Sequence, residues 1–148
     1  MQRLGVIVPS SNTTIEHEFS RVLHGSSLSL HVSRMHLKDV TIEGLEEMEK
    51  EIEVAAKLLK DADVDLVAFG CTSGSLFKGL GYDALVAKQI TEATGCPAVT
   101  TSGAVVKALK TLKACKLSLA TPYIKEITDK EISFLEKSGF EIVNMQSL

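Results

Sequence analysis

The chain has 148 residues, 45% of them hydrophobic, and a net charge of −3, which suffices for one well-formed core or for one domain and the beginning of another. Lysines and arginines are scattered among acidic residues, so there is no basic stripe for nucleic acid or anionic lipid. The five apolar residues before Pro9 are too few for a signal peptide, and no apolar run could cross a membrane. Three cysteines without a CxxC pair fit a reduced compartment and neither a disulfide framework nor a zinc site. We therefore expect a cytoplasmic protein that binds no nucleic acid, membrane or metal.

Short apolar runs alternate with helical patterns along the whole chain. Strands are predicted near residues 3–8, 28–35, 65–70, 98–101, 116–121 and 140–145, and helices near residues 14–23, 42–61, 82–94, 103–113 and 124–138. In the helix over 42–61, an apolar stripe at three- and four-residue spacing is flanked by acidic residues, which we interpret as a solvated face. The alternation predicts an α/β fold: a Rossmann-like, mostly parallel sheet with helices on both faces.

Two of the predicted strands end in loops rich in small polar residues. Residues 4–14 read LGVIVPSSNTT, and residues 65–75 read DLVAFGCTSGS. Because ligands bind beyond the carboxyl ends of parallel strands, we expect the two loops to lie side by side and to face one small ligand. Ser10, Ser11 and Asn12 exceed what a helix cap needs, although a turn and cap is their commonest use. No Lys or Arg lies between Pro9 and Glu16, which suggests a carboxylate held by neutral hydrogen bonds.

Cys71 is the candidate nucleophile. It follows a strand end and precedes a hydroxyl-rich helix start, where backbone amides and the helix dipole favour an anion. We therefore expect its pKa to lie below the ordinary thiol value of about 8.5. The alternative is a small buried cysteine at a strand end. Cys96 and Cys115 each precede a strand, so they lie at the opposite end of the sheet and are interpreted as structural.

Other polar motifs carry weaker signals. Tyr123, in a TPY sequence after a strand, could reach the ligand crevice, or could be half buried in a proline turn. His36, with Arg34, ends the second strand on the ligand side and is a minor candidate. A G-x-S-x-G hydrolase motif is discarded because all four histidines precede Cys71. Residues 79–84 fit a loose dinucleotide motif but do not follow a strand.

Three ordered motifs, VPSSNTT at 8–14, CTSGS at 71–75 and TPY at 121–123, resemble the signature loops of maleate cis-trans isomerases, within the superfamily of aspartate/glutamate/hydantoin racemases and arylmalonate decarboxylases. The resemblance implies two pseudo-symmetric α/β lobes with the site between them, one cysteine from each lobe, no cofactor, and a homodimer. It also implies roles: Cys71 as the nucleophile, Asn12 as a carboxylate-binding side chain, and donors to the substrate from Thr72, Ser73 and Tyr123.

The resemblance also divides the chain. Residues 1–115 would form the first lobe, and residues 116–148 the incomplete beginning of the second. The family's second-lobe cysteine should follow a later strand, so we expect a truncated form of a longer isomerase-type enzyme, without the second acid/base residue, and such a truncated chain need not be active. Three hypotheses follow. The first is isomerisation of maleate, or a similar small dicarboxylate, to fumarate through a thiolate adduct. The second is a racemase of the Asp/Glu/hydantoin type, or a related decarboxylase, although Cys71 argues against decarboxylation. The third is a non-catalytic carboxylate-binding fragment.

Overall fold

A computed structural model describes residues 2–147. The elements in chain order are β1 (Gln2–Pro9), α1 (Ile15–Val22), β2 (Leu28–Met35), α2 (Ile42–Glu49), α3 (Ile52–Lys60), β3 (Leu66–Phe69), α4 (Thr72–Leu76), α5 (Tyr82–Thr94), β4 (Ala98–Thr100), α6 (Thr101–Thr111), β5 (Lys116–Thr121), α7 (Lys125–Lys137) and β6 (Glu141–Ser147). Among these residues, no helix combines the length and apolar character needed to cross a membrane.

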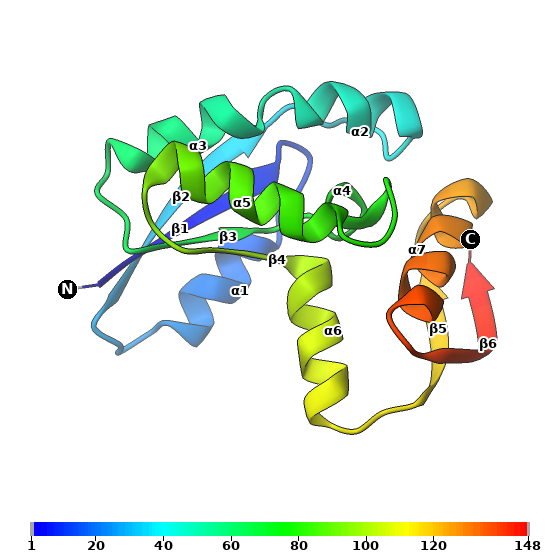
Figure 1. Ribbon diagram of the computed structural model, residues 1–148. Coiled ribbons are helices and arrows are strands. Elements are labelled where there is room, and N and C mark those ends of the chain that lie inside the picture. The colour runs from blue at the N-terminus through cyan, green and yellow to red at the C-terminus, as the bar shows by residue number, and fades with distance from the viewer. Residues whose placement is uncertain (1, 148) are drawn as a thin grey trace.

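The main sheet is fully parallel and has the strand order β2-β1-β3-β4. Helices α2, α3 and α5 lie over one face, and α1 lies on the other (Figure 1). The central strand β1 is buried from Gly5 to Pro9, as expected for a strand covered on both faces. The predicted α/β class, with a parallel sheet flanked by helices, is confirmed.

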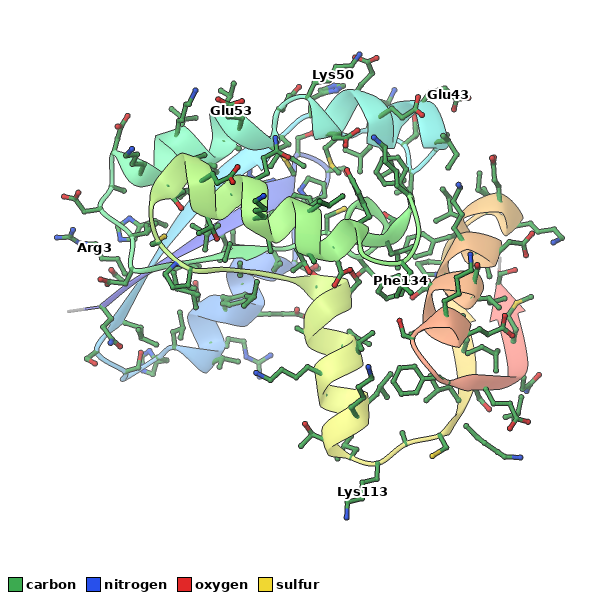
Figure 2. The ribbon with its side chains drawn as sticks, in the orientation of Figure 1. Arg3, Glu43, Lys50, Glu53, Lys113 and Phe134 are labelled. Atoms are coloured by element: carbon green, nitrogen blue, oxygen red, sulfur yellow. The ribbon has the colours of Figure 1, made fainter. Side chains whose placement is uncertain are left out.

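The last two strands do not join the main sheet. β5 and β6 pair with each other in parallel, and α7 connects them (Figure 1). Phe134 lies on the side of α7 that faces the rest of the molecule (Figure 2), and it packs in a small core with Leu76 of α4 and with Leu135 and Phe140. This core docks the β5–α7–β6 unit against the main sheet's helices, while the lobe boundary between residues 115 and 116 stays a prediction.

The helix predicted over residues 42–61 is two helices, α2 and α3, separated at Lys50 and Glu51. The Glu51 carboxylate accepts a hydrogen bond of 2.8 Å from the backbone N–H of His36, at the end of β2. This non-local contact ties the break to the sheet, so that both helices bury their apolar residues against it. The predicted solvated face holds for Lys50 and Glu53, which point away from the molecule (Figure 2). It is wrong for Glu49 and Glu51, which are half-buried and accept hydrogen bonds from Tyr82 and from the His36 backbone.

Candidate active site

A small cavity opens beyond the carboxyl ends of β1 and β3. Its volume is about 220 Å³, below the usual range of drug-sized ligand pockets, so it suits a ligand of few atoms. The two loops lie side by side, as predicted, and the segment before α7 contributes Tyr123 to the cavity wall. It is lined by Pro9, Ser11, Asn12, Leu37, Val40, Gly70, Cys71, Thr72, Ser73 and Tyr123.

Cys71 is itself the N-cap residue of α4. Its sulfur accepts a hydrogen bond from the backbone N–H of Gly74 at 3.3 Å, and it lies 3.8 Å from the Ser73 hydroxyl oxygen. Position 74 must be glycine for this approach, because a Cβ there would lie 2.8 Å from the sulfur and 2.5 Å from the terminal methyl group of Met48. The nucleophilic atom of the hypothesis therefore also completes the first turn of a helix.

The predicted lowering of the Cys71 pKa is wrong. Only 6% of the residue is exposed, and burial raises the pKa of its thiol, against the opposing effects of the Gly74 amide and the Ser73 hydroxyl. Desolvation prevails because the water removed from around the sulfur would solvate a thiolate better than one amide and one hydroxyl do. The thiol is therefore protonated and neutral at pH 7 in the free protein.

Asn12 can serve both as a helix cap and as a ligand-binding side chain, the two roles considered for its loop. Its Oδ1 accepts hydrogen bonds of 3.0 Å from the backbone N–H groups of Thr14 and Ile15, so the side chain does cap the start of α1. These donors fix the orientation of the amide. With the oxygen occupied, Asn12 has its NH₂ group to offer a ligand in the cavity that it lines.

Ser10 lies outside the cavity lining. Its hydroxyl accepts a hydrogen bond of 3.0 Å from the backbone N–H of Leu37, which ties the loop after β1 to the segment after β2. Ser11, the next residue, does line the cavity. Of the two serines in this loop that were predicted to bind substrate, the structure thus brings only Ser11 to the site.

Arg34, a minor candidate from its place at the end of β2, does not line the cavity but holds one of the loops that do. Its Nη1 donates hydrogen bonds to the backbone oxygens of Ser10 (3.0 Å) and Asn12 (2.9 Å), and its Nη2 pairs with Glu16. It therefore holds the loop that carries Asn12, while its companion His36 does not line the cavity. The adjacency of β1 and β2, which the sequence does not specify, explains this role.

Tyr123 reaches the cavity from the turn before α7, as predicted. Burial is the main cause of a raised pKa of its phenol, the charges of Glu131 and Cys71 add to the rise, and hydrogen bonding with Ser73 and Thr72 opposes it. The phenol therefore stays protonated and can donate. Thr128 of α7 stabilises the turn, because its fully buried hydroxyl donates a hydrogen bond of 3.3 Å to the Tyr123 carbonyl oxygen.

Sequence reasoning did not single out Glu131. It lies on α7, and its Oε2 is buried without a hydrogen-bond partner among residues 2–147. Burial raises the pKa of this carboxyl group. A Glu among the other charged residues of α7 carries no signal that would separate it from a solvated one.

The lining of the cavity is neutral within the described residues. Its polar groups are hydroxyls, one amide and a thiol, and its remaining walls are apolar. Such a site can hold a small anion through converging hydrogen bonds and place it against a sulfur atom, without forming an ion pair.

The chain matches a family and several curated proteins over its length. The family model described as arylmalonate decarboxylase matches residues 4–148. The chain is 34% identical to the maleate isomerase of Pseudomonas putida, over 100% of this chain and 64% of that protein, and 34% identical to the maleate isomerase of Geobacillus stearothermophilus, over 99% and 63%. The arylmalonate decarboxylase of Bordetella bronchiseptica is 28% identical over 98% of this chain and 60% of its own. The chain thus spans a little under two thirds of these relatives.

Solved structures agree with the sequence matches. The maleate isomerase of Pseudomonas putida S16 superposes with a TM-score of 0.94 at 30% identity, over 99% of this chain and 64% of that one. A mutant of the Nocardia farcinica maleate cis-trans isomerase, with a covalently bound succinylcysteine intermediate, gives a TM-score of 0.94 at 31% identity, over 99% and 63%. With the family model matched along nearly the whole chain, these likenesses confirm the resemblance read from the three loop motifs: the chain belongs to the arylmalonate decarboxylase family.

Proposed function

We propose that this site isomerises maleate, or a similarly small cis-dicarboxylate, to its trans isomer through covalent addition of Cys71. The observation that carries the proposal is the position of the Cys71 sulfur, in a cavity of about 220 Å³ walled by neutral hydrogen-bonding groups. The names of the relatives support it, as does the succinylcysteine bound in the Nocardia structure.

Binding would rely on hydroxyl and amide donors. Asn12 offers its NH₂ group, and Thr72, Ser73 and Tyr123 offer hydroxyl groups around the thiol. A neutral thiol suits this arrangement, because a thiolate present beforehand would repel an incoming dianion at close range. Burial of Cys71 thus favours substrate entry, and the thiol proton is given up only as the carbon–sulfur bond forms.

The proposed reaction conserves all atoms and needs no redox partner. A bond forms between the sulfur and one alkene carbon, the thiol proton leaves the sulfur, and the other alkene carbon gains a proton, which gives a succinyl thioether. Rotation about the new carbon–carbon single bond brings the carboxylates apart. Cleavage of the carbon–sulfur bond with loss of a proton from the neighbouring carbon then gives fumarate and restores the thiol. Donors near the carboxylates stabilise the charge that develops there during addition.

The test compares the three cysteines of one molecule. Alkylation by iodoacetamide is followed by mass spectrometry across pH, with and without maleate, while NMR follows conversion of maleate to fumarate. We expect maleate to shield buried Cys71 and to leave Cys96 and exposed Cys115 unaffected. Turnover should vanish in Cys71→Ser and persist in Cys96→Ser. Full activity of Cys71→Ser would overturn the proposal, and shielding without turnover would favour the carboxylate-binding hypothesis.

The raised pKa of Cys71 also favours a second candidate function. A neutral thiol can protonate a carbanion next to a carboxylate, which is the step that racemisation of a small acid requires. Solvent deuterium entering a chiral substrate, with no conversion of maleate, would identify this activity.

A further inference from the structure

We propose that the first turn of α6, through Thr101 and Ser102, is the positioning element that holds the Cys71 thiol in its cavity. The inference rests on the proposed role of Cys71 as the nucleophile. Neither residue lines the cavity, so both would act through the backbone on either side of Cys71.

Thr101 holds the segment that precedes Cys71. Its hydroxyl donates a hydrogen bond of 2.9 Å to the carbonyl oxygen of Phe69, the last residue of β3. Phe69 is almost fully buried. The carbonyl group two residues before the thiol is therefore held by a side chain from another helix.

Ser102 holds the segment that follows Cys71. Its backbone N–H donates to the Ser75 hydroxyl at 3.2 Å, and its own hydroxyl donates to the Ser75 carbonyl oxygen at 3.2 Å. The Ser75 hydroxyl in turn donates to the Thr72 carbonyl oxygen at 2.9 Å. Ser75 and Ser102 are 0% and 2% exposed, so water does not compete for these bonds.

These contacts matter because α4 is too short to hold its own shape. A helix of five residues is not stable by itself, so its conformation depends on tertiary contacts. Ser75 and Ser102 satisfy each other reciprocally: Ser75 accepts from a free N–H at the start of α6, and Ser102 donates to a carbonyl group near the end of α4. With Phe69 held as well, the Cys71 thiol lies between two fixed points.

Cysteine accessibility measures this positioning directly. A buried thiol is alkylated from transiently opened states, and each net hydrogen bond lost shifts such an opening by about fivefold. We therefore expect Thr101→Val and Ser102→Ala each to accelerate alkylation of Cys71 by about fivefold, with Cys96 unchanged. Where the chain turns over maleate, kcat should fall while KM changes little, because the groups proposed to bind the carboxylates remain.

Matched variants separate positioning from general destabilisation. Thr101→Ser keeps the hydroxyl and should restore the parent rate. Thr111→Val removes a hydroxyl of the same helix that bonds locally to the Lys107 carbonyl oxygen, at 2.8 Å, and should have no effect. Should Thr101→Val not fold, Ser75→Ala and Ser102→Ala still test the contacts, because each removes a different hydrogen bond between α4 and α6. Each should accelerate alkylation of Cys71, and the double variant should accelerate it more than either single variant.

Two results would overturn the inference: an unchanged rate at Cys71 in Thr101→Val and Ser102→Ala, or equal acceleration of Cys71 and Cys96, which would indicate global opening. Absence of maleate turnover in the parent chain would count against the proposed function alone, because alkylation needs no substrate.

Discussion

Replacing Gly74 with alanine tests whether the Cys71 sulfur is held as the cap of α4. The added Cβ would lie 2.8 Å from that sulfur and 2.5 Å from the terminal methyl group of Met48. Met48 can move its flexible end, but the thiol can escape only by rotating away from the Gly74 amide, which breaks the 3.3 Å hydrogen bond. Overpacking costs about 1–3 kcal/mol, and the better helix propensity of alanine offsets up to about 1 kcal/mol. The expected net loss in the free energy of unfolding is about 1–2 kcal/mol.

A double-mutant cycle isolates the part of this loss that involves the sulfur. In a Cys71→Ala background only the Met48 methyl group must move, so Gly74→Ala should cost about 1 kcal/mol less than in the parent. Urea unfolding measures all four proteins, and with a slope of about 1–3 kcal/mol per molar urea the parent and Gly74→Ala should differ by about 1 M in midpoint. Additivity of the two changes within about 0.5 kcal/mol would refute the proposed contact.

Three further predictions concern the surroundings of the site. Tyr82→Phe removes a hydrogen bond of 2.8 Å to Glu49 and should cost about 1 kcal/mol. Burial and Glu49 raise the pKa of the Tyr82 phenol, so the parent should lose stability as pH rises beyond the ordinary tyrosine value of about 10, and urea unfolding of Tyr82→Phe between pH 8 and 11 should show a weaker loss. Burial also raises the pKa of the Glu131 carboxyl group, so the stability that its protonated form contributes is full at pH 3 and lost as the group ionises at higher pH. In thermal melts, Glu131→Gln should therefore stabilise the fold by about 1 kcal/mol at pH 7 and leave it unchanged at pH 3. Arg34→Lys cannot keep both loop carbonyls and Glu16, so maleate should shield Cys71 about fivefold less well, whereas Arg21→Lys on the exposed side of α1 should behave like the parent.

The parallel sheet and the proximity of the loops after β1 and β3 were predictable from the sequence. The carboxyl ends of parallel strands lie at one edge of a sheet, whatever the order of the strands. Cys71 and Asn12 reached the cavity for that reason, whereas Tyr123 reaches it from the turn after β5, a strand of the smaller sheet. The depth at which a thiol is buried depends on packing from α2 and from the turn before α7, and this is why the sign of the Cys71 pKa shift was predicted wrongly.

Contacts between distant segments were beyond the sequence pattern. The apolar stripe continues across residues 42–61, so the sequence does not mark the break in the helix, where the Glu51 carboxylate bonds to the backbone of His36. Arg34 acquires its role because β2 lies beside β1, and Ser102 because α6 begins against α4. Each of these depends on a neighbour that no local propensity specifies.

Because the Cys71 sulfur is both helix cap and proposed nucleophile, the reaction and the helix compete for the same lone pairs. Serine is a better cap than cysteine and nearly the same size, so Cys71→Ser should lose the chemistry without losing the fold. Selection for stability alone would therefore favour the inactive residue at this position. Covalent addition to the sulfur would also weaken its hold on the Gly74 amide, so that the first turn of α4 would lose its cap for as long as the adduct exists.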